Sequence, residues 1–451
     1  MTVIEQLADF VAGLRLADAP PPAADTLRLH LFDTLVAGVV GATTPEGQAA
    51  AGLAADMSAV GSVAAPGGGL PTSGPLAAPV ACIATRCTEI DDIDLPSCTT
   101  PGAVAVPTAL ALSRESGDAD VFLAALLAGY EALVRFGQAA DGPTILYRGI
   151  WPTYLAGTLG AAATAARLLG LSAEATAHAL AAAVTLTAGT SGRIRGLSSR
   201  WLTLGCAVQN GVLAALGARR GLRGDLALLD GAWSEASGIR LAAEVLLADL
   251  GRPLVIERVS LKPYCAAKQV TSSIAAFAGL LADHCLDPAA IERVVVAVPP
   301  AYARMIDQPA PAPDRLGGVA SAQYQLALAA HYPDELLDVR RPMPHEEPAF
   351  RALMARVRVV AEPSLARDYP RTWPARVTVA TAAGELTREV GHTPGDPSHP
   401  FSWDDATTKA TRVLRGIADA AAVDRLAAAC RGLGKSTSLA ELLASLPSNL
   451  A

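Results

Sequence analysis

Four carboxylates within six consecutive positions are the residues of this chain best suited to proton transfer. The segment EIDDIDLPSC, which Gly and Pro residues bound and which we therefore expect to be a loop, contains Glu89, Asp91, Asp92 and Asp94. Carboxylates this close together can raise one another's pKa, and one of them would then be a usable base or acid at neutral pH. The alternative is a solvated acidic turn, because most runs of charge are solvated surfaces.

Basic residues offer partners for an anionic substrate. Lys262 follows the apolar run PLVIERVSL and precedes Pro263, so we expect it at a domain boundary, where a cleft cation would lie. The alternative for Lys262 is an ordinary surface lysine. Arg193, Arg195 and Arg200 crowd the segment SGRIRGLSSR ahead of a helix, and such a cluster suits an anionic group. A solvated loop explains Arg193 and Arg195 equally well.

Aromatic and thiol side chains are further candidates for a site. Tyr147, Trp151 and Tyr154 flank a Gly-Ile-Trp-Pro turn and would line a pocket with apolar walls, with core packing as the alternative. Cys98 and Cys265 lie beside candidate residues, but neither has a histidine nearby in the sequence. A thiolate nucleophile is therefore disfavoured.

Charge and hydropathy exclude several classes of partner. The net charge is −7 and the 451 residues contain no Lys/Arg-rich run, so neither nucleic acid nor an anionic membrane is an expected partner. The segment MTVIEQLADFVAGL carries Glu5 and Asp9 within its apolar stretch and predicts an amphipathic helix, not a signal peptide. No uninterrupted apolar run reaches membrane-spanning length. We expect a cytoplasmic protein.

The cysteines and histidines give no sign of a metal centre. Seven cysteines are scattered along a chain that needs no disulfide staples, so we expect reduced thiols. Seven histidines lack metal-ligand neighbours at short spacing. Glycine-rich stretches such as PGGGLP match neither a phosphate-binding loop nor a dinucleotide fingerprint.

The periodicity of the first part of the chain is helical. A composition that is 51% hydrophobic but only 4% aromatic favours closely packed helices over sandwiches or barrels. The segment at 65–78 is a loop by composition. Helical periodicity is clearest at 23–39, 119–136, 155–170 and 203–219.

The later part of the chain has a mixed pattern. The segments IERVVVAVPP, RVRVVAEP, ARVTVATAAG and ELTREVGH predict strands, and SAQYQLALAAHY and FRALMARV predict helices between them. After GDPSHP the chain returns to helix. We therefore predict a mainly α protein in which 1–266 and 400–451 form a large all-helical domain and 267–399 a smaller α+β lid domain. The cleft between such domains is the default position of an active site.

Six segments, spread over nearly the whole chain, together resemble one family. They are LADFVAGLRLADAPPPAADTLRLHLFDTLVAGVVG, EIDDIDLPSCTTPGAVAVPTALAL, YRGIWPTYLAGTLGAAATAARLLGLS, RWLTLGCAVQNGVLAALGARRG, SLKPYCAAKQVTSSIAAF and GHTPGDPSHPFSWDDATTKA. In this order they resemble the MmgE/PrpD family, the relatives of 2-methylcitrate dehydratase, cis-aconitate decarboxylase and iminodisuccinate epimerase. The third resembles the family's Arg-Gly-x-His-Pro-Thr segment, and the last its Gly-Asp-Pro turn.

The resemblance implies a homodimer without a cofactor. It also implies general acid–base chemistry on small polycarboxylates, by dehydration, decarboxylation or epimerisation. Such chemistry needs a base beside a carbon acid, an acid beside the leaving group, and cations for the carboxylates.

This sequence departs from the family pattern at its histidines. Four positions at which the family has histidine hold other residues: Thr100, Trp151, Thr203 and Thr271. At the start of the fourth segment the family's lysine is replaced by Arg200. The tyrosine that the family has in the lid helix falls on Leu328. Threonine and tryptophan do not titrate near neutral pH, so we do not expect the ordinary family mechanism.

Other charged groups of the pattern are retained. We predict catalytic roles for Asp91, Asp92 and Lys262, and we expect Asp91 and Lys262 to face a solvated cleft. Lys268 stands where relatives often carry arginine and still offers a point charge. Substrate-binding roles are predicted for Glu89, Thr100, Arg148, Trp151, Arg200, Thr203, Tyr264, Lys268 and Thr271.

Three functions compete for these residues. A cofactor-independent lyase acting on a small anionic metabolite would use carboxylate, lysine and arginine groups in place of the family histidines. An isomerase or epimerase acting on a small acid is one alternative. A catalytically inactive metabolite-binding protein is another, because binding needs the cations and not the base. The retained acidic and basic residues favour an enzyme.

Overall fold

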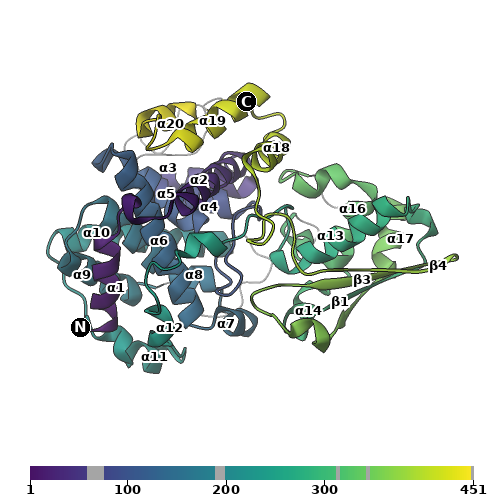
Figure 1. Ribbon diagram of the computed structural model, residues 1–451, viewed down its shortest axis with the longest axis horizontal. Helices are drawn as coiled ribbons and strands as arrows, with labels where there is room; N and C mark the ends of the chain where they lie inside the picture. The colour runs from purple at the N-terminus through teal and green to yellow at the C-terminus, as the bar shows by residue number, and fades with distance from the viewer. Residues whose placement is uncertain (58–75, 188–198, 311–314, 342–345, 448–451) are drawn as a thin grey trace. The chain divides into compact units, whose positions relative to one another are not determined.

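The computed structural model describes most of the chain (Figure 1). The predicted loop at 65–78 lies almost wholly outside the described residues, as do Arg193 and Arg195. The described residues are 1–57, 76–187, 199–310, 315–341 and 346–447.

The chain folds into two compact units. Unit 1 comprises Met1–Val259 and Ser402–Ala451, and unit 2 comprises Ser260–Phe401. Periodicity alone places these borders at 266/267 and 399/400. Unit 2 is thus an insertion between the first helices of unit 1 and its last ones.

Unit 1 is helical, and its described residues contain no β-strand. Three helices that pack side by side, α6, α8 and α10, form its centre. The helices of unit 1 are α1 (Val3–Gly13), α2 (Pro21–Gly41), α3 (Pro45–Met57), α4 (Ala77–Arg86), α5 (Gly102–Ala111), α6 (Ala119–Ala139), α7 (Gly142–Arg148), α8 (Pro152–Leu168), α9 (Ala173–Thr185), α10 (Ser199–Arg219), α11 (Ala232–Ser237), α12 (Ala243–Leu246), α18 (Trp403–Val413), α19 (Ala420–Gly432) and α20 (Leu439–Ser445).

Small residues allow the central helices to approach closely. A Cβ atom on Gly160 of α8 would lie 2.7 Å from the Cβ atom of Leu133 in α6. A Cβ atom on Gly211 of α10 would lie 2.4 Å from the carbonyl oxygen of Thr158 in α8. Side chains do not tolerate such distances, so glycine is required at both crossings. Closely packed helices, which the composition predicts, therefore form the core of unit 1 because small residues stand at the helix crossings.

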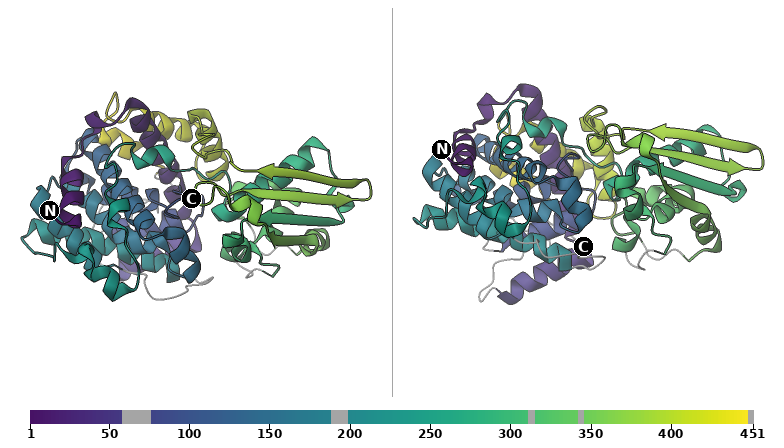
Figure 2. Two further views of the ribbon diagram at one scale, coloured as in Figure 1. Left: turned by 60° about the horizontal axis from the view of Figure 1, so that its bottom comes forward. Right: turned by 90° about the horizontal axis from the view of Figure 1, so that it is seen from below.

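The last helices of the chain return to unit 1. Helices α18 and α19, yellow in Figure 1, pack against the purple α2, and Figure 2 shows them from two further directions. Ser402 and Asp405 form a capping box that begins α18. The ring of Trp403 lies 5.9 Å from that of Phe32 in α2. The C-terminal segment thus covers the helix that carries His30 and Asp33.

Unit 2 contains one small mixed sheet in the strand order β2-β1-β3-β4. Strand β1 pairs in parallel with β2, Val294 opposite Val357, and antiparallel with β3, Val294 opposite Val379. Helix α13 packs against β3 and β4, and α14 against β1 and β2. The elements are α13 (Lys268–Asp283), β1 (Arg293–Val298), α14 (Pro300–Ile306), α15 (Arg315–Gly318), α16 (Ala322–His331), α17 (Pro348–Arg356), β2 (Val357–Ala361), β3 (Ala375–Thr381) and β4 (Gly384–Val390).

The predicted fold class, mainly α with a smaller α+β part, is confirmed. All four predicted strands form, and the N-terminal amphipathic segment is helix α1. Among the described residues one helix, α10, has the length and composition of a membrane span. More than half of its apolar window, 56%, is buried inside the protein, as is usual for a core helix.

Candidate active site

The acidic loop joins α4 to α5, and its four carboxylates are buried. Glu89 is 4% exposed, and Asp91, Asp92 and Asp94 are 0% exposed. The alternative of a solvated acidic turn is therefore wrong. The expectation that Asp91 and Lys262 face a solvated cleft is also wrong, since Lys262 is only 1% exposed. Buried charges require partners, and the partners distinguish the four carboxylates.

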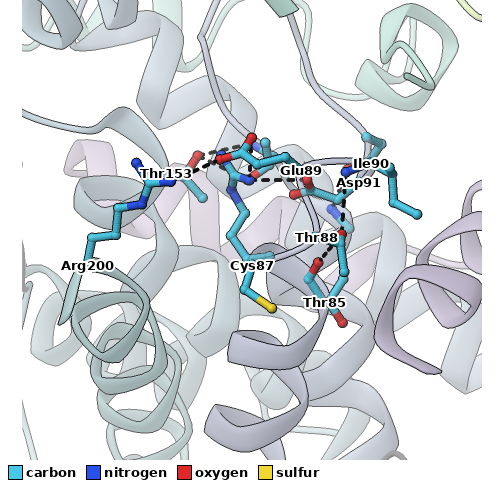
Figure 3. Close-up of polar contacts among 12 residues, drawn as sticks. Thr85, Cys87, Thr88, Glu89, Ile90, Asp91, Thr153 and Arg200 are labelled. Carbon is cyan, nitrogen blue, oxygen red and sulfur yellow. Dashed lines mark hydrogen bonds and ion pairs between the residues drawn. The ribbon is translucent and has the colours of Figure 1, made fainter. Parts of the chain in front are cut away.

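Glu89 lies between two guanidinium groups (Figure 3). Its Oε2 is 2.9 Å from Nη1 of Arg86, the last residue of α4. Its Oε1 is 3.6 Å from Nη2 of Arg200, in the first turn of α10. Arg86 Nη1 is also 3.2 Å from Oδ1 of Asp91. Two cations and two carboxylates thus form one buried group, here called the Glu89 cluster, whose formal charges cancel.

The backbone of Glu89 is strained. Its φ angle is 60°, in the left-handed region that residues other than glycine rarely adopt. Such a conformation costs on the order of 1–3 kcal/mol and persists only where the surroundings enforce it. The conformation turns the chain between the end of α4 and the rest of the acidic loop.

Aromatic rings hold both guanidinium groups. Arg200 Cζ is 4.1 Å from the ring centre of Trp201 and 5.5 Å from that of Trp151. Arg86 Cζ is 5.2 Å from the Trp201 ring. Trp151, the N-cap residue of α8, stacks on Tyr154 with an angle of 17° between the rings. Rings and cations thus form a continuous stack contributed by α4, α8 and α10.

The charges of the cluster set the protonation of its neighbours. Burial raises the pKa of the Tyr154 phenol, although the nearby Arg200 and Arg86 oppose this, so the phenol is a hydrogen-bond donor at neutral pH. The Tyr154 hydroxyl and the Trp201 indole N–H have no hydrogen-bond partner among the described residues. Burial opposes the charge of Arg86, but Asp91 and Glu89 outweigh it and raise the pKa of that guanidinium. Arg86 therefore stays charged.

Thr100 connects the acidic loop to the start of α8. Its backbone N–H donates to Oγ1 of Thr153 at 3.1 Å, and the two hydroxyl oxygens are 3.2 Å apart. Thr153 follows Trp151 and Pro152 in the first turn of α8. The predicted residues Thr100 and Trp151 are thus brought to the same end of one helix.

Asp92 belongs to a separate buried network. Its Oδ2 accepts a hydrogen bond from the Tyr130 hydroxyl at 2.6 Å and lies 3.0 Å from Nδ1 of His30. Its Oδ1 accepts from the backbone N–H of Gly102 at 2.9 Å. Burial raises the pKa of Tyr130, and the adjacent Asp92 charge adds to this effect. Asp92 therefore fastens the loop to α2, α5 and α6.

Asp94 fastens the other end of the loop. Arg258 Nε lies 3.0 Å from Asp94 Oδ1, and the backbone N–H of Ser97 donates to Asp94 Oδ2 at 3.0 Å. Burial raises the pKa of Asp94, and Arg258 opposes this shift. These contacts give Asp94 a structural role in the turn that ends at Thr99.

Two further predicted residues of unit 1 are at least partly exposed. Arg148 ends α7 and is exposed. Thr203 is partly exposed, and its hydroxyl donates to the carbonyl oxygen of Ser199 within α10 at 3.3 Å. That contact of Thr203 does not involve the Glu89 cluster.

Lys268 of unit 2 lies against the Gly-Asp-Pro turn. The buried Lys268 forms an ion pair with Asp396 and donates to Thr393 Oγ1 at 2.8 Å. The carbonyl oxygen of Gly395 accepts from the backbone N–H of Leu261 at 2.9 Å, which holds the chain beside Lys262. Burial, opposed by Asp396, lowers the pKa of Lys268.

Tyr264 and Thr271 complete the predicted set in unit 2. Tyr264 is partly exposed. Thr271 is buried, and its hydroxyl donates to the carbonyl oxygen of Lys268 at 2.8 Å within α13. Among the described residues, no group of three or more His, Cys, Asp or Glu side chains is placed to hold a metal ion. All seven cysteines are free.

Family models match both parts of the chain. Residues 5–239 match the MmgE/PrpD N-terminal domain, and residues 264–433 match the MmgE/PrpD C-terminal domain. The chain belongs to the MmgE/PrpD family. It is 24% identical, over 475 aligned positions, to the cis-aconitate decarboxylase-like protein oryM of Aspergillus oryzae (strain ATCC 42149 / RIB 40). The alignment covers 99% of this chain and 98% of that relative.

Membership of the MmgE/PrpD family confirms the resemblance carried by the six segments and supports lyase-type activity at the level of the family. The C-terminal family model does not coincide with a structural unit. It extends through α18 and α19, which fold in unit 1. Both halves of the MmgE/PrpD pattern therefore contribute to the unit that contains the Glu89 cluster.

Sequence reasoning missed several residues around the acidic loop. Arg86 and Trp201 adjoin predicted residues, but the motifs do not mark them as partners. Thr153 belongs to the Trp-Pro-Thr segment, so the sequence itself offers it as a candidate. His30 and Tyr130 are far from Asp92 in sequence, and only the packing of α2 and α6 brings them to it.

Replacing Arg86 by methionine should strongly destabilise the protein. The variant Arg86→Met leaves the buried Glu89 and Asp91 without this cation, and breaking a buried ion pair typically costs about 3–5 kcal/mol. The matched control is Arg15→Met, because Arg15 pairs with Asp18 on the surface and loses at most about 1 kcal/mol. Urea unfolding followed by circular dichroism measures both, and equal losses would contradict the assignment.

Proposed function

We propose that this protein is a cofactor-independent lyase that acts on a small anionic metabolite in a specialised biosynthetic or catabolic pathway, in the cytoplasm. The observation that carries the proposal is the Glu89 carboxylate held between Arg86 and Arg200. A carboxylate beside two cations combines a proton acceptor with groups that stabilise a developing anion. The decarboxylase-like name of the relative oryM agrees with this reaction class.

The proposed reaction is an elimination beside a carboxylate. Glu89 or Asp91 removes a proton from the carbon next to the substrate carboxylate, and the released electron pair forms a carbon–carbon double bond. The leaving group on the adjacent carbon departs with its bonding electrons and is stabilised by cationic side chains. In a decarboxylation, carbon dioxide leaves instead and the resulting carbanion takes up a proton.

We assign the base to Glu89 or Asp91 and not to Asp92. The oxygens of Asp92 already accept from Tyr130 and Gly102 and contact His30. Glu89 and Asp91 instead adjoin Arg86, a cation that would attract the carboxylate of a substrate. In unit 2, we propose Lys262 as a catalytic cation and Tyr264, Lys268 and Thr271 as binding residues.

The charge balance of the cluster points to a weakly charged substrate. Arg86 and Arg200 are already neutralised by Glu89 and Asp91, so each added carboxylate makes the buried group more negative. A substrate with few carboxylates suits this charge balance, and a leaving group that carries its own activation would demand less acid catalysis. An epimerase or an inactive binding protein remains as the alternative.

The experiment that tests the function begins with a strain that lacks the gene. Metabolite profiling identifies the acid that accumulates, and the purified protein is then incubated with that acid. Formation of an unsaturated or decarboxylated product supports the lyase. A product that differs only in configuration supports the epimerase, and binding without any product supports the inactive protein.

Removing the proposed catalytic groups should lower turnover of that acid. Glu89→Gln, Asp91→Asn and Lys262→Ala should each reduce kcat by more than about tenfold, because a positioned acid or base contributes about 10²–10⁴ in rate. The matched control is Glu131→Gln, since Glu131 is also buried and paired with an arginine, 2.6 Å from Arg135. Wild-type turnover in any of the first three removes that residue from the mechanism.

The missing histidines should exclude the tricarboxylate reactions of relatives. We expect no family-like turnover of 2-methylcitrate, citrate or cis-aconitate, because Thr100, Trp151, Thr203 and Thr271 supply no group that titrates near neutrality. Steady-state assays of the wild type and of the double variant Thr100→His with Trp151→His measure this. Robust wild-type turnover of any of these acids would overturn the argument.

We also propose a homodimer formed through unit 1. Helix α10 presents an exposed stripe on which Leu202 is 44% and Leu213 is 51% exposed, with the exposed Cys206 between them. Helical spacing places these residues on one face, and a second copy of the chain would cover it.

Light scattering should give twice the chain mass of 46.0 kDa at micromolar concentration. Leu213→Glu should reduce the mass to that of one chain, because a charge in an apolar interface is costly. The control Val360→Glu changes an equally apolar residue of unit 2, 41% exposed, and should leave the dimer intact. A wild-type mass of one chain would contradict the dimer.

A further inference from the structure

A buried lysine reaches the acidic loop from the C-terminal part of the chain. Lys409 lies on α18 and is 4% exposed. Its Nζ lies 2.7 Å from Oδ1 of Asp33 on α2, and it donates to the carbonyl oxygen of Ile90 at 3.0 Å. Ile90 stands between Glu89 and Asp91. One ammonium group therefore connects three segments that are far apart in sequence.

The surroundings of Lys409 are acidic and closed to solvent. Asp33 and His30 on α2, Asp92 in the loop and Tyr130 on α6 form one electrostatic neighbourhood. Burial raises the pKa of Asp33, and Lys409 is the strongest opposing influence on it. Without Lys409, the carboxylate of Asp33 and the carbonyl group of Ile90 would each lose a charged partner in the interior.

The contact with Ile90 lies beside a strained residue of the loop. Glu89 holds its left-handed conformation immediately before Ile90, and such a conformation requires support from its neighbours. Asp92 and Asp94 follow Asp91 in the chain. They are fastened by Tyr130, Gly102 and Arg258. The bond from Lys409 to Ile90 acts on the stretch between those anchors and Glu89.

We propose that Lys409 is a positioning residue that fixes the backbone between Glu89 and Asp91, so that both carboxylates face Arg86. Its consequence for catalysis rests on the proposed function, whereas the holding of the loop does not. The C-terminal helices would then support the candidate active site through the hydrogen bond from Lys409 to Ile90.

Hydrogen–deuterium exchange tests the proposal without a substrate. In Lys409→Met, amide exchange in a peptide covering 86–95 should rise by about tenfold or more, because a charged hydrogen bond to that backbone is lost. Exchange in the central helices α6 and α8 should change far less. The matched control is Lys435→Met, since Lys435 pairs with Asp25 at 2.6 Å on the surface of the same unit. It should leave the 86–95 peptide unchanged.

A double variant separates positioning from general stability. Asp33→Asn with Lys409→Met removes the unpaired buried charge, so thermal unfolding should return toward that of the wild type. The bond to Ile90 is still missing, and exchange at 86–95 should stay raised. Wild-type exchange at 86–95 in this folded double variant would overturn the proposal.

Measurements of turnover separate the support of the loop by Lys409 from the catalytic roles proposed for Glu89 and Asp91. If the loop is loosened, kcat for the identified acid should fall by at least about tenfold while KM changes little, because the carboxylates are misplaced rather than removed. Raised exchange with wild-type kcat would leave Lys409 as the support of the loop but would contradict the roles proposed for Glu89 and Asp91.

Discussion

The charge balance around the Arg86 guanidinium is the constraint on which the candidate site depends. A buried guanidinium must have carboxylate partners, and Glu89 and Asp91 supply them from the loop that follows its own helix. Those carboxylates in turn need the loop to turn sharply, which it does through the left-handed backbone of Glu89. The local strain is therefore compensated by electrostatics within a few residues, and the rest of unit 1 keeps water away.

The supports of the loop come from distant parts of the chain, including the segment that follows unit 2. Helix α2 supplies His30 and Asp33, α6 supplies Tyr130, and α18 supplies Lys409. The last of these follows the whole of unit 2 in sequence. A chain that ended after unit 2 would lack the cation that pairs with Asp33, so the C-terminal return is part of the construction of the loop.

The sequence predicts the fold well because periodicity and turn punctuation are local signals. The segments IERVVVAVPP and ARVTVATAAG are strands, and SAQYQLALAAHY is a helix, as their patterns indicate. The site is harder to predict because the role of each carboxylate depends on which distant side chain it pairs with. Asp91 and Asp92 are neighbours of identical chemistry, yet one faces Arg86 and the other faces Tyr130 and His30. The direction of each side chain is set by the packing of α2, α4 and α6, which no local pattern encodes.

Trp151 and Arg200, which the sequence analysis interprets as two separate departures from the family pattern, contact each other in the structure. An indole carries no proton near neutral pH, but its face attracts a cation, and a planar guanidinium stacks on it better than an ammonium group does. With Arg200 Cζ 5.5 Å from the Trp151 ring and 4.1 Å from the Trp201 ring, the replacements form a contact in which each suits the other. The Trp151 ring thus lies where it orients a cation, and it cannot carry a proton near neutral pH. Glu89 lies against that cation, so a carboxylate and not an imidazole is the group beside Arg200 that is able to accept a proton.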